Sequence, residues 1–193
     1  NNDVKIDSDN FYKFIHEITI DNIIHPLTFN EENKLVSSGC KVISWLPYIT
    51  NHYLSKSLNN KDKFISIDLA TARFLGMKLS TLKNVGKISE NLLQYQGDND
   101  FSFRAKKLGY KVLIYTKSYC NLYDGDTGFK NTNIKSISIL HKSFFSIRSA
   151  NNIKYKFNFL CNHFNKIYSL LILSSMLLNC YIKTLISSKR KKT

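Results

Sequence analysis

The chain has 193 residues, 43% of them hydrophobic and 22% charged, a balance that excludes a disordered chain and allows a sizeable core. Its formal net charge is +14, yet all 14 acidic residues lie within residues 3–126, whereas residues 127–193 contain 12 Lys and Arg and no acid. Seven Gly and two Pro argue against a turn-dense all-β sandwich, so we expect a nearly neutral α/β domain followed by a cationic tail.

The first ninety residues are expected to alternate between short helices and strands. Ser8 and Asp9 precede four apolar residues at helical spacing, which predicts a capped helix with one apolar face: Phe11, Phe14, Ile15 and Ile18. Short apolar runs then predict four strands, at residues 35–37, 42–45, 64–69 and 74–79. Ser80 is expected to cap a short helix that ends at Gly86.

The most informative segment, residues 97–115, begins with Asp98 and Asp100 at the entrance of a predicted helix. The helix is expected to bury Phe101, Ala105 and Leu108 and to pair Asp100 with Arg104 along its surface. Gly109 fits a left-handed position after the last turn, and residues 112–115 predict a buried strand.

Two interpretations of the acidic pair remain open at this point. An Asp at a helix start is most often a cap for backbone N–H groups. A carboxylate held between a sheet and a helix, where the helix N-terminus favours its charged form, is also what a general base requires.

The segment GDNDFSFRAKKLGY resembles the acid-containing motif of inverting family 2 glycosyltransferases of the GT-A fold. Residues 1–4, Asn-Asn-Asp-Val, resemble the end of the strand that carries the metal-binding acid motif of that family. Thr127-Gly128 and residues 143–159 resemble the region after the catalytic domain in bacterial sugar transferases that build surface polysaccharides. The resemblance is most specific at residues 98–110.

This resemblance implies the second half of a GT-A-like fold, with a mixed sheet flanked by helices and then a basic helical C-terminal tail. Residues 1–128 would form the acceptor-binding and catalytic half, and residues 129–193 a basic, amphipathic tail that associates with membranes. The nucleotide-gripping strands of the fold precede the motif at Asn1, so the chain is expected to be part of a longer protein.

The resemblance also implies roles for individual residues. Asp98 is expected to act as the catalytic base, and Asp100 either assists it or serves structurally as the partner of Arg104. Asp3 is the expected ligand of Mg²⁺ or Mn²⁺ at the diphosphate of a nucleotide-sugar donor, with support from Asn1. Arg73 is expected to bind donor phosphates or an acidic acceptor, unless it is simply a surface residue.

Other candidate residues have less support. Trp45 and Tyr95 either stack on sugar rings or pack in the protein. Many relatives have a further metal-binding His after the strand, whereas residues 118–128 have none, so Asp124 or Asp126 would have to substitute. The four Cys and five His show no zinc-ligand or redox spacing, which predicts reduced thiols in a cytoplasmic protein.

The cationic tail has three possible partners: an anionic membrane, nucleic acid, or solvent alone. No zinc-finger spacing, RRM signature or GXXG clamp supports nucleic acid. Residues 167–186 are apolar but interrupted by polar residues, which favours a helix lying in the membrane interface over one that spans it. We therefore expect a peripheral protein on the inner face of the cell membrane.

Two functional hypotheses follow from the sequence. In the first, the protein transfers a sugar, with inversion, from a nucleotide sugar to a hydroxyl of a lipid-linked glycan during surface-polysaccharide synthesis. In the second, it is a non-catalytic module in which the acidic pair caps a helix and the tail binds lipid or nucleic acid.

Overall fold

The computed structural model describes residues 4–36, 39–52, 62–71, 73–92, 94–123 and 136–189. Within them the protein is a mixed α/β structure with six α-helices and a mixed sheet. The chain divides into two compact units. Unit 1 comprises residues 1–43, 50–88 and 98–125, and unit 2 comprises residues 44–49, 89–97 and 126–193. Residues 44–49 and 89–97 lie within the expected catalytic half, residues 1–128, but belong to unit 2.

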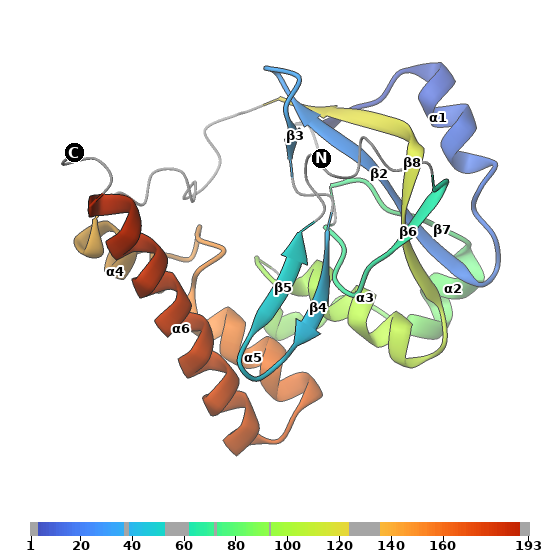
Figure 1. Cartoon of the computed structure of the whole chain (residues 1–193). Coiled ribbons are helices and arrows are strands. Elements are labelled where there is room, and N and C mark those ends of the chain that lie inside the picture. Colours follow the sequence, from blue (N-terminus) through green and yellow to red (C-terminus); the bar gives the residue numbers. More distant parts are fainter. Residues whose placement is uncertain are drawn as a thin grey trace. The chain divides into compact units, whose positions relative to one another are not determined.

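The sheet of unit 1 is built on two long parallel strands, β2 (Asn22–Asn30) and β8 (Lys111–Leu122). Figure 1 shows these two strands side by side at the centre of the sheet. Each carries two short antiparallel neighbours on its other edge. These neighbours are β1 (Val4–Lys5) and β6 (Phe64–Ser66) beside β8, and β3 (Leu35–Val36) and β7 (Gly76–Met77) beside β2.

Strand β2 is the main element that the sequence did not predict. His25 and Pro26 lie in the middle of this strand and interrupt its run of apolar residues. Pro26 also lacks an N–H for the hydrogen-bond ladder of the sheet. The ladder with β8 accommodates the Pro by a register shift, because Pro26 lies opposite Tyr115 whereas Leu27 lies opposite Tyr119. Such a bulge lets a Pro occupy a central strand.

Alternating side chains of β2 and β8 build a core on each face of the sheet. On one face, Ile23, Leu27, Val112 and Ile114 pack with residues of two helices, α2 (Leu79–Val85) and α3 (Gly97–Lys107): Val85, Phe101 and Ala105. On the other face, Ile24 and Tyr115 pack with Phe14 of α1 (Ser8–Ile15). Each fully buried aliphatic or aromatic side chain stabilises the fold by about 1.5–3 kcal/mol.

Most local predictions in unit 1 are confirmed, although β6 and β7 are shorter than expected and β8 is longer. Helix α3 and the strand at residues 112–115 are present, and Gly109 has a φ of 92°. The prediction that Leu108 is buried was wrong, because α3 ends at Lys107 and Leu108 is exposed. Its N–H is shared between the carbonyls of Arg104 and Ala105, so the last turn tightens and turns this side chain outward.

Two predicted helix caps were also wrong. Helix α1 is capped by Asp7, whose carboxylate accepts the N–H of Asn10 at 2.9 Å, rather than by Ser8 or Asp9. Helix α2 begins after Lys78, which provides no side-chain cap, so Ser80 lies inside the helix. Its predicted end at Gly86 is confirmed, with a φ of 86°.

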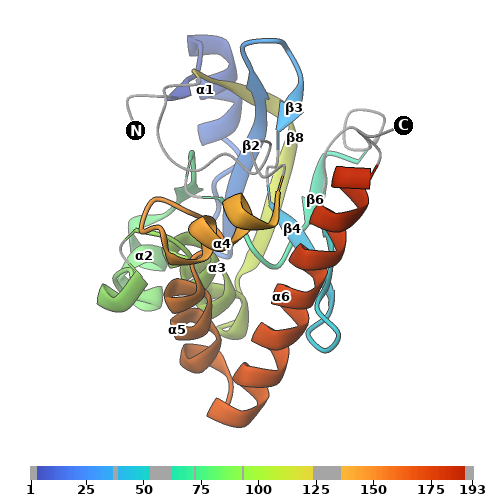
Figure 2. The same cartoon turned by 90° about the vertical axis from the view of Figure 1, so that its left-hand side faces the viewer.

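Unit 2 contains the three C-terminal helices, α4 (Ile137–Phe145), α5 (Ile153–His163) and α6 (Lys166–Lys189) (Figure 2). Helix α6 packs against α4 and α5. The helices are capped by the neutral side chains of Ser136, Asn152 and Asn165. Buried apolar residues from all three helices form the core of this unit: Leu140, Phe144, Phe159, Leu160, Ile172, Leu173 and Met176.

The tip of a β-hairpin also packs within unit 2. Strands β4 (Cys40–Ser44) and β5 (Ile49–His52) form this hairpin, and residues 44–49 at its tip belong to unit 2. Trp45 lies against Phe164 and Phe159, with ring centroids 5.0 and 6.2 Å apart. Tyr95, which precedes α3, donates its hydroxyl to the carbonyl of Arg148 at 2.8 Å. These contacts give both aromatic residues a packing role.

Candidate active site at the start of helix α3

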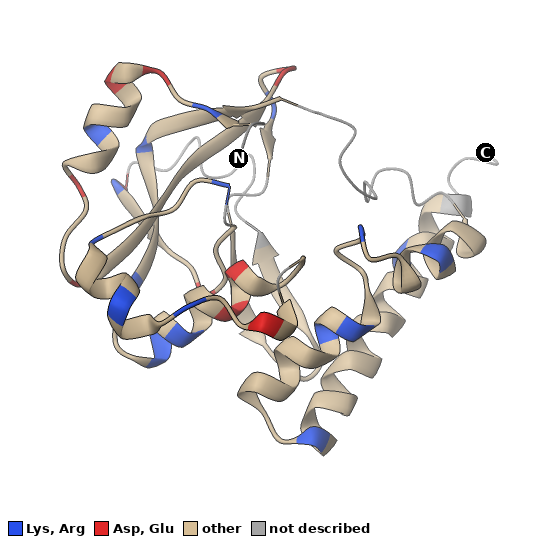
Figure 3. Ribbon diagram, turned by 180° about the vertical axis from the view of Figure 1, so that it is seen from behind, with Lys and Arg blue, Asp and Glu red and all other residues tan. Residues whose placement is uncertain are grey.

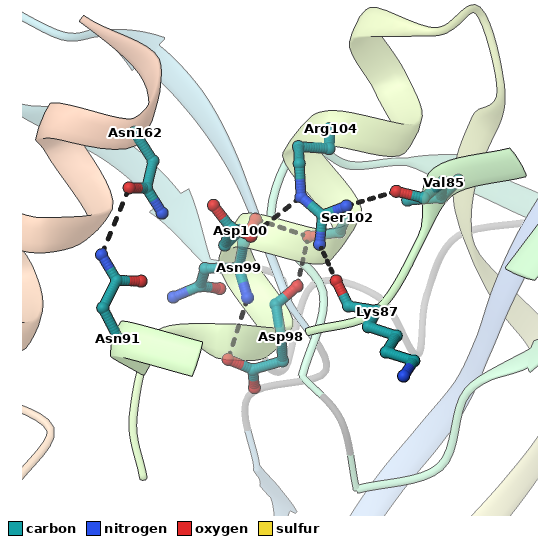
Figure 4. Close-up of polar contacts among 9 residues, drawn as sticks. All are labelled: Val85, Lys87, Asn91, Asp98, Asn99, Asp100, Ser102, Arg104 and Asn162. Atoms are coloured by element: carbon teal, nitrogen blue, oxygen red, sulfur yellow. Dashed lines mark hydrogen bonds and ion pairs between the residues drawn. The ribbon is translucent and has the colours of Figure 1, made fainter. Parts of the chain in front are cut away.

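The first turn of α3 carries two carboxylates in different surroundings. Asp100 is 0% exposed and accepts a hydrogen bond from Arg104 Nε at 2.9 Å. Asp98 is half-buried, and its Oδ1 accepts the N–H of Asn99 at 2.9 Å. Figure 4 shows the Asp98 carboxylate directed away from the Asp100–Arg104 pair.

Arg104 fixes this turn to the segment that follows α2. Its Nη1 donates to the carbonyl of Val85, and its Nη2 donates to the carbonyl of Lys87 at 2.7 Å (Figure 4). One guanidinium therefore satisfies a buried carboxylate and two backbone carbonyls, which its fork of donors allows. The predicted pairing of Asp100 with Arg104 is confirmed, but Asp100 is in the interior rather than on the helix surface.

Ser102, which sequence reasoning missed, connects the turn to the loop after β6. Its buried Oγ accepts the N–H of Ala70 at 3.1 Å and donates to the carbonyl of Asp98 at 2.9 Å. Ser102 and Ala70 are 32 residues apart, and only the folded sheet brings them together. The carbonyl of Asp98 is thus bonded by a buried hydroxyl, in a contact that does not involve the Asp98 side chain.

The same loop continues to Thr71 and Arg73, which lie near His25 at the bulge of β2. The His25 Nδ1 contacts the carbonyl oxygen of Pro26, so this nitrogen carries the proton, and Nε2 accepts from the Thr71 hydroxyl at 2.8 Å. Burial lowers the pKa of His25 from 6.5 to about 4, and the positive charge of Arg73 adds to this effect. No local signal in the sequence marks this neutral, buried imidazole.

The free energy of unfolding should depend on the titration of His25. Between about pH 6.5 and pH 4 the unfolded chain protonates this residue whereas the folded protein does not, so stability falls as the pH falls, by about 1.4 kcal/mol per unit. Urea unfolding from pH 7.5 to pH 4.5 measures this slope, and His25→Asn should flatten it. The matched control is His16→Asn at an exposed position, and an equal slope in both variants would contradict the assignment.

Burial also makes two of the cysteines poor nucleophiles. All four cysteines are free, with Cys40 and Cys120 buried. Burial and the nearby charge of Asp68 raise the pKa of the Cys40 thiol to about 12, and burial raises the pKa of Cys120. Because the thiolate is the nucleophile, neither residue is suited to covalent catalysis.

The expected metal site falls outside the described residues. Asn1, Asp3, Asp124 and Asp126 are all in segments that the structure does not describe. The described ranges contain no group of three or more His, Cys, Asp and Glu side chains that could hold a metal ion.

Comparisons with known proteins leave the family open. A scan against protein-family models finds no family that matches the chain. A search of curated proteins finds no significant match.

Proposed function

We propose that the protein is an inverting, nucleotide-sugar-dependent glycosyltransferase with a GT-A-like fold. In this proposal its acceptor is a hydroxyl of a lipid-linked glycan of the cell surface, and it works at the inner face of the cell membrane. One observation carries the proposal: the first turn of α3 separates a buried carboxylate, Asp100, from a half-buried one, Asp98, whose backbone Ser102 holds.

In the proposed reaction, Asp98 accepts the proton of the acceptor hydroxyl as that oxygen attacks the anomeric carbon of the donor. The bond from this carbon to the diphosphate breaks, its electron pair leaves with the nucleoside diphosphate, and the configuration inverts. A general base of this kind must lie within hydrogen-bond reach of the hydroxyl. Asp100 acts as a positioning residue, because its carboxylate holds Arg104.

Arg73 is proposed to bind the donor diphosphate, where its charge would offset the charge of the leaving group. Its proximity to His25 and Cys120 supports a place beside the loop that Ser102 holds. Mg²⁺ or Mn²⁺, with Asp3 and Asn1 as the proposed contacts, would supply electrostatic stabilisation of the diphosphate. No step above depends on a metal, and Asn1 and Asp3 lie outside the described residues.

The second candidate is a non-catalytic binding module, and one contact favours it. Asp98 Oδ1 accepts the N–H of the next residue, which is the local bond expected of an acid that merely orders a helix start. In that case Asp98 would stabilise α3, and the cationic C-terminal tail would bind lipid or nucleic acid.

The test is turnover by the full-length protein. UDP-, GDP- and dTDP-sugars are each incubated with a lipid-linked monosaccharide and Mg²⁺ or Mn²⁺, and release of nucleoside diphosphate is measured. We expect release with one donor class that depends on the acceptor, and NMR of the product should show an inverted anomeric centre. No acceptor-dependent release from any donor, or a product with retained configuration, would contradict the proposal.

A further inference from the structure

Helix α6 has an exposed, largely apolar face opposite its buried face. Its inner face is buried through Ile172, Leu173 and Met176. Exposed residues on the outer face recur every three or four positions, which is the repeat of an α-helix. These residues form the outer stripe: Ile167, Leu171, Ser174, Leu178, Ile182 and Leu185. Eighteen residue steps make this outer stripe about 27 Å long.

A hollow of about 520 Å³ adjoins the outer stripe. Its lining is mainly apolar and comes from the end of α4 and from α5 and α6: Phe144, Phe145, Ile147, Phe157 and Leu170. Phe145 is 77% exposed, and Ile147 and Leu170 are also exposed. Because Leu170 both lines the hollow and flanks the stripe, the apolar surface continues from α6 to the α4–α5 turn.

The helices that form this apolar surface carry basic side chains and no acidic ones. Figure 3 shows Lys and Arg, and no Asp or Glu, on helices α4, α5 and α6. The exposed cations of these helices and their turns are Lys142, Arg148, Lys154, Lys166 and Lys183. Even the helix starts, where Asp is a common cap, use Ser136, Asn152 and Asn165.

We propose that the outer stripe of α6 and the adjoining hollow dock on an anionic lipid bilayer, with α6 lying in the plane of the interface. Lys154 lines the hollow and Lys166 directly precedes Ile167 of the stripe, so their ammonium groups can stay at the headgroups while the apolar side chains enter the acyl boundary. Docking of a second copy through the same face would bring two acid-free, cationic surfaces together. Charge complementarity therefore selects the bilayer, and the inference does not depend on the transferase proposal.

Hydrogen bonds of α6 within unit 2 explain why it lies on the membrane rather than across it. By length and composition, Lys166–Ser187 could span a bilayer, and 28% of its apolar stretch is buried. However, Ser175 Oγ accepts the N–H of Tyr48 at 3.0 Å, and Asn179 donates to the carbonyl of Tyr48 at 3.1 Å. Tyr181 also hydrogen-bonds His141 of α4. A spanning α6 would lose these bonds or carry their polar partners into hydrocarbon.

The test is co-sedimentation of the full-length protein with vesicles of phosphatidylcholine and phosphatidylglycerol at 70:30, against phosphatidylcholine alone. Binding should require the anionic lipid and should weaken as NaCl is raised. Ile167→Glu and Leu178→Glu should each lower the partition coefficient about tenfold or more. Ile20→Glu is the matched control: Ile20 is 73% exposed and Ile167 is 76% exposed, and both variants add one negative charge.

Results of three kinds would overturn the proposal. The first is equal loss of binding in Ile20→Glu and Ile167→Glu, which would reduce the effect to net charge. The second is a preference for single-stranded RNA over anionic vesicles, or a dimer in sedimentation velocity that Leu178→Glu dissociates. The third is resistance of the bound protein to carbonate extraction at pH 11, which would show that α6 spans the bilayer.

Discussion

Replacing Asp98 by Asn should lower the rate of sugar transfer about 10²- to 10⁴-fold, which is the contribution of a well-placed general base. The amide has nearly the same shape as the carboxylate, and its oxygen can still accept the N–H of Asn99. The bond from Ser102 to the carbonyl of Asp98 does not involve the altered side chain. The fold should therefore persist, and the loss should appear in kcat under saturating donor and acceptor.

Asp9→Asn provides the matched control for this variant. Asp9 is an exposed acid in the first turn of α1, so its replacement removes a negative charge from a helix N-terminus in the same way. Turnover should be unchanged in Asp9→Asn, and both variants should unfold within a few degrees of the unmodified protein. Near-normal turnover in Asp98→Asn would remove Asp98 as the base and favour the non-catalytic module.

Local sequence patterns predicted the elements around the candidate site better than the site itself. The spacing of Asp100 and Arg104 predicted their ion pair, and Gly109 predicted the left-handed residue after α3. Both features depend on neighbours within a few positions along the chain. Helix periodicity also predicted the burial of Phe101 and Ala105, and it was wrong only at Leu108, where the helix has already ended.

The contacts that tie Ser102 and His25 to the loop after β6 could not be predicted in this way, because they join distant segments. The bond between Ser102 and Ala70 and the bond between His25 and Thr71 both depend on the sheet. That sheet is centred on β2, which Pro26 and its bulge concealed from pattern analysis. Asp98 itself is a first-turn acid by its sequence, and whether it is a base or a cap depends on what binds beside it.

Replacing Arg104 by Ala should lower the free energy of unfolding by about 3–5 kcal/mol, the usual cost of breaking a buried ion pair. The variant deprives the Asp100 carboxylate of its guanidinium partner, although Asp100 is 0% exposed and Arg104 only 26% exposed. It also removes the donors that bind the carbonyls of Val85 and Lys87. Urea unfolding of the variant and the unmodified protein at pH 7 measures this difference.

Lys111→Ala is the control for Arg104→Ala, because the Lys111–Asp21 pair has a similar distance of 2.9 Å but lies on the surface. Exposed pairs contribute about 0–1 kcal/mol, since water screens both charges. Combining Arg104→Ala with Asp100→Asn should recover part of the loss, because the double variant no longer buries a charge. Equal losses in Arg104→Ala and Lys111→Ala would show that the interior pair does not hold the first turn of α3. In that case the position of Asp98 would depend on the bond from Ser102 to its carbonyl rather than on the ion pair.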